Sequence, residues 1–190
     1  VRPLPEAGIP TYAVLGNHDY SMSGENSEPK PKLAAQLEKA LEEVGIVVLK
    51  NEAVKLLLPE NKNPSEPLYL VGIGAHQPNN YKPKVALKQL PDNSPRIAIM
   101  HNTKTLEAFP PQTAPMAIAG HTHSRQIRIP FTPQWSWLTA TKKLEHVSSW
   151  SGGEQGSGNR IHVNRGIGMS IIPVRFNCPP ELTLFTLRAQ

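Results

Sequence analysis

The sequence predicts an α/β fold in which short strands alternate with short helices in layers. Three observations support this prediction. Short apolar runs recur along the 190 residues, and amphipathic or polar stretches separate them. Proline, at 20 residues, interrupts the chain too often for long helices. The length suits one compact domain with a substantial core, and strands alternating with helices indicate helices packed on a sheet.

The first half of the chain contains one clear helix and several strand-like runs. A helix is expected from Pro31 to Val44, because leucines recur along it at four-residue intervals and Gly45 follows as a C-terminal cap. The remaining elements expected here are strands at Thr11–Leu15, Ile46–Leu49, Ala53–Leu58 and Leu68–Ile73 and a short helix at Lys84–Leu90.

The second half repeats the alternation. Its expected elements are strands at Arg96–Met100, Pro115–Ala119, Gln126–Phe131, Arg160–Asn164 and Leu182–Leu187 and a short helical turn at Thr103–Phe109. Residues 132–159 end in a run of serine and glycine and are predicted to form a long mobile loop. The sequence shows no internal repeat and no linker, which indicates a single domain.

Composition and charge exclude several classes of protein. The single cysteine excludes a disulfide scaffold and a multi-cysteine metal site, and no apolar run reaches the ~18 residues of a membrane span. Residues 96–190 hold 10 basic and 4 acidic side chains, whereas residues 1–95 hold 10 and 11. A basic half favours an anionic partner, although solubility alone also explains it. The 6% aromatic content weighs against nucleic-acid stacking.

Three strand-like runs each lead into a polar tip that contains histidine, at His18, His101 and His121. Ligands of α/β sheets bind where the carboxyl ends of strands converge, so the three tips are expected to build one site. Gly16 and Gly120 are expected to let the backbone turn sharply before two of these tips.

The pair His121 and His123 is the strongest single signal. If the strand continues through both residues, the two-residue period places both imidazoles on one face. Neutral imidazole is a good ligand for zinc, iron and manganese. Taken alone, this pair has a second interpretation as a chance surface pair, and Asn17–Asp19 has one as a polar turn. Together, the three tips favour a metal site.

These segments resemble the calcineurin-like metallophosphoesterases, in particular the bacterial YaeI/YkuE-type phosphodiesterase branch. The resemblance covers about residues 10–187 and is carried by Gly16–Asp19, His101, Gly120–His123, Asn164–Gly168 and Pro173–Leu182. It implies a two-sheet sandwich flanked by helices. It also implies hydrolysis of a phosphodiester or lipid-linked phosphate by two divalent metal ions (manganese, iron or zinc) that bridge a hydroxide.

The resemblance also implies a role for each matching residue. Asn17, His101 and His121 match ligands of the second metal, and His123 matches a ligand of the first. His18 matches the histidine that steadies the phosphoryl oxygens or protonates the leaving group, and Asp19 is expected to orient it. Arg125 stands where the family often has glycine, and it either contacts a substrate phosphate or points to solvent.

The sequence departs from the family in one respect. Members carry Asp-x-His and Gly-Asp motifs before the Gly-Asn-His-Asp segment, and neither precedes Gly16 here. Residues 1–190 are therefore expected to be the C-terminal part of a single metallophosphoesterase domain, with an incomplete sandwich and low stability. The alternative function is a truncated, non-catalytic module that binds a metal or phosphate.

The partners that the resemblance implies are small. A phosphoester small molecule or a phospholipid-like substrate is expected, together with association with a membrane surface. No nucleic-acid partner is expected.

Overall fold

The computed structural model describes residues 2–24, 26–56, 67–123, 126–127, 149–152, 156–170 and 172–188. The helices are α1 (Pro3–Glu6), α2 (Pro31–Glu42) and α3 (Pro83–Leu87), with 3₁₀ helices η1 (Asn17–Tyr20) and η2 (Thr103–Ala108). The strands are β1 (Thr11–Ala13), β2 (Ile46–Val48), β3 (Glu52–Lys55), β4 (Tyr69–Gly72), β5 (Arg96–Met100), β6 (Ala117–Ala119), β7 (Ser149–Gly152) and β8 (Arg160–Val163).

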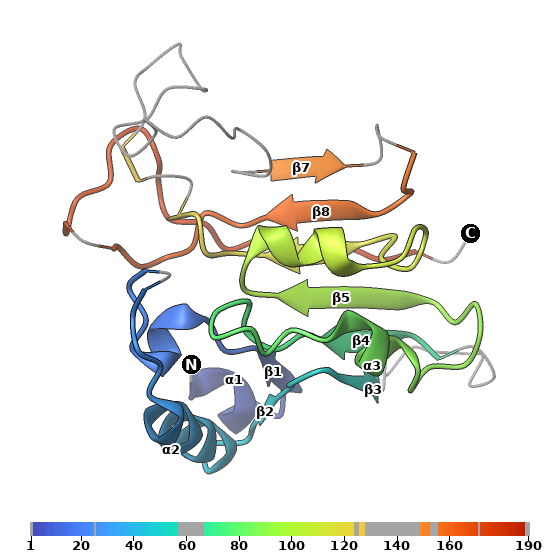
Figure 1. The fold of residues 1–190 in the computed structure, drawn as a ribbon, viewed down its shortest axis with the longest axis horizontal. Coiled ribbons are helices and arrows are strands. Elements are labelled where there is room, and N and C mark those ends of the chain that lie inside the picture. The colour runs from blue at the N-terminus through green and yellow to red at the C-terminus, as the bar shows by residue number, and fades with distance from the viewer. Residues whose placement is uncertain are drawn as a thin grey trace.

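The larger sheet has six strands in the order β3-β4-β5-β6-β8-β7. Its four central strands are parallel, and the strands at its two edges, β3 and β7, are antiparallel to their neighbours. Met100 pairs with Ala119 and Ala119 with Val163, so three of the parallel strands end at the same level. Figure 1 shows β5 and β8 pointing toward one edge, where the loops that follow them gather.

A second sheet, made of the parallel pair β1 and β2, packs against the first. Side chains of the central strands alternate between two cores, as the two-residue period of a strand requires. Ala98 and Met100 face the core under α3 and η2, whereas Ile97 and Ile99 face the β1–β2 layer. The predicted α/β fold, with two sheets flanked by helices, is confirmed.

Helix α2 covers the outer face of the small sheet. It begins at Pro31, in the first helical turn where proline is tolerated, and Gly45 follows its end with a φ of +82°. Ala34 is its one fully buried residue and packs with Leu15 and Val48. The predicted helix is thus confirmed, although it ends two residues earlier.

The prediction of a long loop over residues 132–159 is wrong near its end. Residues Ser149–Gly152 form β7, which pairs with β8, so that Trp150 lies opposite His162. No pattern in residues 149–152 predicts this strand, because its hydrogen bonds come from the partner strand β8. Residues 132–148 lie outside the described residues. Most of the predicted strand Gln126–Phe131 also lies outside them, and only an isolated bridge between Ile127 and Phe176 is seen.

The prediction of a strand at Leu182–Leu187 is also wrong. No strand of the described ranges pairs with it, so the segment follows the protein surface, with Leu184 92% exposed. Side chains hold it instead. Asn164 donates a hydrogen bond to the Thr183 hydroxyl, and Phe185 packs edge-on against His162. An apolar alternation forms a strand only where a neighbouring edge offers hydrogen bonds.

The helices of the described segments are all short. None of them is long and apolar enough to cross a membrane.

Candidate metal centre

Three loops at the carboxyl edge of the sheets bring polar side chains together. Asn17 opens η1 shortly after β1, His101 follows β5 directly, and His121 lies two residues beyond β6. The amide of Gly120 donates a hydrogen bond to the carbonyl of His101 (3.2 Å), which ties two of the loops together. The expected convergence of the three tips is therefore observed.

Side chains from the three loops are in direct contact. His101 Nε2 lies 3.0 Å from Asn17 Oδ1 and 3.1 Å from His121 Nδ1. The two imidazole rings meet edge to face, with centroids 4.8 Å apart. These three residues are the set that the resemblance implied for one metal ion.

A backbone carbonyl orients the Asn17 side-chain amide. Its Nδ2 donates to the carbonyl of Met22 (2.7 Å), and the side chain is buried. Because the nitrogen is used in this way, the oxygen is the atom presented to His101. No sequence pattern points to Met22, because its contribution is a backbone carbonyl, which every residue type has.

Gly16 is required for a reason other than the one expected. Its backbone is extended (φ −109°, ψ −178°), so no sharp turn needs a glycine there. A Cβ at this position would instead lie 2.6 Å from three atoms of the His101 ring. A Cβ at Gly120 would meet no heavy atom within 4 Å. The glycine before Asn17 therefore makes room for the imidazole.

Burial favours the neutral forms of His101 and His121. It lowers the pKa of His101 to about 4, with a further contribution from the neighbouring imidazoles, first among them His121. Burial likewise lowers the pKa of His121, and His123 and His18 add to the effect. A neutral imidazole keeps the lone pair that a metal ion needs.

The three converging atoms fit a cation. Three atoms here can act as acceptors: Asn17 Oδ1, His101 Nε2 and His121 Nδ1. Nε2 carries at most one proton, so it cannot donate to both of its neighbours at once. Two ligands in adjacent octahedral positions at ~2.1 Å from an ion lie ~3.0 Å apart, close to both observed distances. An ion among them would satisfy every lone pair. The third donor is an amide, and within the described ranges no three histidine, cysteine or acidic side chains form a metal-binding group.

His18 and Asp19 lie beside this cluster on η1. His18 is exposed, and the Asp19 carboxylate accepts a hydrogen bond from the Gly16 amide (2.7 Å), which caps the 3₁₀ helix. For Asp19 the described residues show this one side-chain hydrogen bond and none to His18. The expectation that Asp19 orients His18 remains a prediction.

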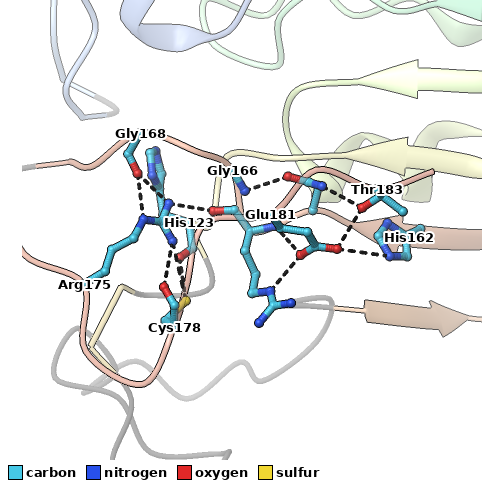
Figure 2. Close-up of polar contacts among 10 residues, drawn as sticks. His123, His162, Gly166, Gly168, Arg175, Cys178, Glu181 and Thr183 are labelled. Carbon is cyan, nitrogen blue, oxygen red and sulfur yellow. Dashed lines mark hydrogen bonds and ion pairs between the residues drawn. The ribbon is translucent and has the colours of Figure 1, made fainter.

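The strand does not continue through His121 and His123, so the condition for placing both imidazoles on one face is not met. Strand β6 ends at Ala119, and both histidines have positive φ values, of 67° and 49°. The left-handed turn sends the His121 ring to His101, whereas His123 faces the C-terminal loop. Figure 2 shows His123 beside Gly168, Arg175 and Cys178.

The C-terminal loop contributes to the pKa of His123. Burial and then the positive charge of Arg175 lower its pKa, while a hydrogen bond with the Gly168 backbone raises it. Sequence reasoning assigned no role to Arg175 or Gly168. The run Pro173–Leu182, which carried part of the resemblance, was a signal that this loop has a function.

His76 stacks on Tyr81, with centroids 4.5 Å apart, and its Nδ1 lies 3.4 Å from the Thr105 hydroxyl, so it is not part of the converging set. Arg125 lies outside the described residues, and its role remains a prediction.

Comparison with known proteins gives a consistent set of relatives. The chain is 30% identical to phosphodiesterase YaeI of Escherichia coli over 188 residues, which are 98% of this chain and 61% of the relative. It is 26% identical to the UDP-2,3-diacylglucosamine pyrophosphatase LpxG of Chlamydia trachomatis over 215 residues, 94% of this chain and 64% of the relative.

A third relative carries the name of the metallophosphoesterases. It is YkuE of Bacillus subtilis, 31% identical over 108 residues, which are 54% of this chain and 34% of the relative. The chain thus spans about three fifths of the length of the first two relatives. No protein-family model and no solved structure matches it.

Proposed function

Because this chain belongs to the calcineurin-like metallophosphoesterase family, we propose that it acts in metal-dependent hydrolysis of a phosphoester. The observation that supports the proposal most strongly is that His101 Nε2 lies 3.0 Å from Asn17 Oδ1 and 3.1 Å from His121 Nδ1. The proposed site holds two divalent ions, of manganese, iron or zinc. Asn17, His101 and His121 bind one ion, and His123 binds the other.

Each part of the chain has a distinct task in this proposal. Bound divalent ions polarise a phosphoryl oxygen and make a water molecule more acidic, which supports in-line displacement. The neutral rings of His101 and His121 supply lone pairs without adding charge. His18, exposed on η1 beside the cluster, steadies the phosphoryl oxygens or donates a proton to the leaving oxygen.

The proposed substrate is a phosphodiester or a lipid-linked phosphate. The names of two relatives, a phosphodiesterase and a pyrophosphatase of a diacylated sugar nucleotide, support this choice. The excess of basic residues in the second half suits an anionic substrate, and we include association with a membrane surface in the proposal.

Hydrolysis of bis-p-nitrophenyl phosphate with added Mn²⁺ tests the proposal. We expect turnover that disappears with a chelator and falls more than ~100-fold in His121→Ala, because a directly bound ligand matters at least as much as a supporting partner. His76→Gln is the matched control, since His76 faces Tyr81 and Thr105. Unchanged turnover in His121→Ala would contradict the role of that residue.

A second function is favoured by one observation. Asn17 Oδ1 and His121 Nδ1 both lie close to His101 Nε2, whereas His123 lies against the C-terminal loop. A non-catalytic module that holds a single metal ion fits this arrangement. Titration calorimetry with Mn²⁺ separates the two functions, because one bound ion and no turnover support the module.

A further inference from the structure

We propose that the C-terminal loop, residues 165–178, is a membrane-docking surface whose exposed apolar side chains enter the interface of an anionic lipid bilayer. The inference rests on the proposed function in one respect, because it assigns the membrane association included there to this loop. All residues of the loop except residue 171 are described. The loop is inverted compared with a usual surface loop, with polar groups inside and apolar side chains outside.

Large apolar side chains are exposed on both arms of the loop. On the first arm, Ile167 is 67% exposed and Met169 is 52% exposed. On the second arm, Val174 is 49% exposed and Phe176 is 54% exposed. Single exposed apolar side chains are common on proteins, whereas a group of them marks a surface that binds a partner.

The two arms are joined by a guanidinium group. Arg175 Nε donates to the carbonyl of Gly168 (2.9 Å), its Nη2 to that of Arg165 (2.9 Å) and its Nη1 to that of Cys178 (3.3 Å). Figure 2 shows the guanidinium among these contacts. Gly168 lies between the two exposed apolar residues of the first arm, and Arg175 lies between those of the second. Their hydrogen bond therefore brings the four apolar residues close together.

A buried amide binds further backbone groups of the loop. Gln126 is 1% exposed, and its Nε2 donates to the carbonyls of Ser170 (3.0 Å), Ile172 (3.2 Å) and Val174 (3.2 Å). Its own backbone carbonyl accepts a hydrogen bond from the amide of Phe176 (2.8 Å). Backbone groups that enter lipid must be satisfied inside the protein, since no water is present there. The inward hydrogen bonds of this loop meet that condition.

The charge of this region indicates which apolar partner the loop binds. Residues 160–188 contain four arginines and one acidic residue, Glu181. Glu181 anchors the base of the loop, because it accepts hydrogen bonds from the backbone amide of Arg165 (3.1 Å) and from its Nε (2.7 Å). Its charge is thus balanced within the protein, and the other arginines leave an excess of positive charge. Positive charge beside an apolar surface favours an anionic bilayer over a neutral apolar partner.

The loop also lies beside the candidate metal centre. Figure 1 shows it in orange-red, projecting beyond the edge of the larger sheet at which the other loops gather. The carbonyl of His123 accepts hydrogen bonds from the Cys178 thiol (3.6 Å) and from the amide of Gln126 (3.1 Å). Docking of the loop therefore brings the candidate metal centre to the level of the lipid phosphates.

Co-sedimentation with lipid vesicles, in a buffer with a chelator and without substrate, tests the proposal. We expect the chain to bind vesicles of phosphatidylcholine and phosphatidylglycerol, and to bind vesicles of phosphatidylcholine alone more weakly. Phe176→Ser is expected to weaken binding about 10-fold and Val174→Ser about 3-fold, because each removes apolar surface from the interface. The matched control is Val85→Ser on α3, a valine of the same 49% exposure, which should change binding less than ~2-fold.

A second measurement uses the chain without substitutions. Methyl signals of ¹³C-labelled methionine are recorded with bicelles of the same two lipids that carry a spin label in the acyl chains. The signal of Met169 is expected to broaden, because its exposed side chain enters the interface. Met22 and Met100 are buried, so their signals should stay sharp and serve as internal controls.

Four results would overturn the proposal. They are binding to neither kind of vesicle, equal losses in Val174→Ser and Val85→Ser, a Met169 signal that stays sharp, and self-association that Phe176→Ser abolishes. The last result would identify a second copy of the chain as the partner of this surface. All four readouts are independent of metal and of catalysis. A chain that binds vesicles and hydrolyses nothing therefore contradicts the proposed function and leaves this inference standing, whereas hydrolysis without vesicle binding does the reverse.

Discussion

The two halves of the candidate site are built in different ways. Asn17, His101 and His121 come from the ends of strands or the turns directly after them, and their side chains contact one another. His123 lies two residues further along the chain, yet its contacts are with the C-terminal loop. One half depends on the sheets, and the other depends on a loop held by polar contacts.

The difference shows what fixes each of these side chains in space. Strands β5, β6 and β8 pair in register, so the backbone hydrogen bonds between them fix the positions of His101 and His121. His123 lies instead against the C-terminal loop, where its carbonyl accepts a hydrogen bond from the Cys178 thiol. Changes in the loop are therefore expected to affect the second half of the site and spare the first.

Removal of the His101 imidazole is expected to have the largest effect on metal affinity. His101→Ala deletes the atom that lies within 3.1 Å of both other donors, so we expect Mn²⁺ affinity of the first half to fall more than ~100-fold. Calorimetric titration measures this. His76→Gln serves as the control, and equal loss in both variants would show that the convergence is not what binds the ion.

Replacing Gly16 with alanine is expected to have the second largest effect. Gly16→Ala places a Cβ 2.6 Å from the His101 ring, and overpacking of this kind costs about 1–3 kcal/mol in unfolding free energy. The ring must also move, so metal affinity should fall with stability. Gly120→Ala is the matched control, because its Cβ meets nothing within 4 Å. Chemical denaturation that ranks the two variants equally would contradict the close approach.

The anchor of the loop should show a characteristic pH dependence. Burial raises the pKa of Glu181, but hydrogen bonds from Arg165 and Thr183 outweigh it and lower the pKa to about 2. A depressed pKa stabilises the folded chain above pH 4.5, and this stabilisation is lost as the pH falls toward 2.

Glu181→Gln removes that contribution. We expect it to lower the unfolding free energy by about 2 kcal/mol at pH 7, the size of a hydrogen bond to a charged group, and by less as the pH falls toward 2. His162, 3.8 Å from the same carboxylate, remains as a second contact. Denaturation curves at several pH values measure the difference, and a constant difference at all of them would contradict the depressed pKa.

The smallest effect is expected at the end of the chain. Leu184 is 92% exposed, so Leu184→Ser should change the unfolding free energy by less than ~0.5 kcal/mol and leave both halves of the site intact. Urea denaturation checks this. A loss above ~1 kcal/mol would show that residues 182–187 pair as the strand that the sequence predicted.

The contrast between the two halves also explains what the sequence could predict. The bounds of β5 are those expected, because Pro95 precedes an apolar run that His101 ends. The convergence of His101 and His121 followed from the rule that neighbouring parallel strands end at one edge, whereas Asn17 follows β1, a strand of the second sheet. Strand β7 was missed because its hydrogen bonds come from β8, a partner that local pattern does not reveal.

The support of His123 lay beyond sequence reasoning for a similar reason. Its carbonyl accepts a hydrogen bond from the Cys178 thiol, 55 positions further along the chain, and no local pattern reveals so distant a partner. Likewise, His121 and His123 adopt positive φ values although neither is a glycine, so the residue types do not reveal this left-handed turn.

X-ray absorption spectroscopy of the chain loaded with one equivalent of Zn²⁺ tests the central claim most directly. If the tips of β5 and β6 and the start of η1 build one site, the bound ion has at least two imidazole ligands at ~2.0–2.1 Å, with oxygen completing the shell. Loss of one imidazole in His121→Ala would confirm the assignment. An ion surrounded by oxygen alone, or a spectrum that His121→Ala leaves unchanged, would contradict it.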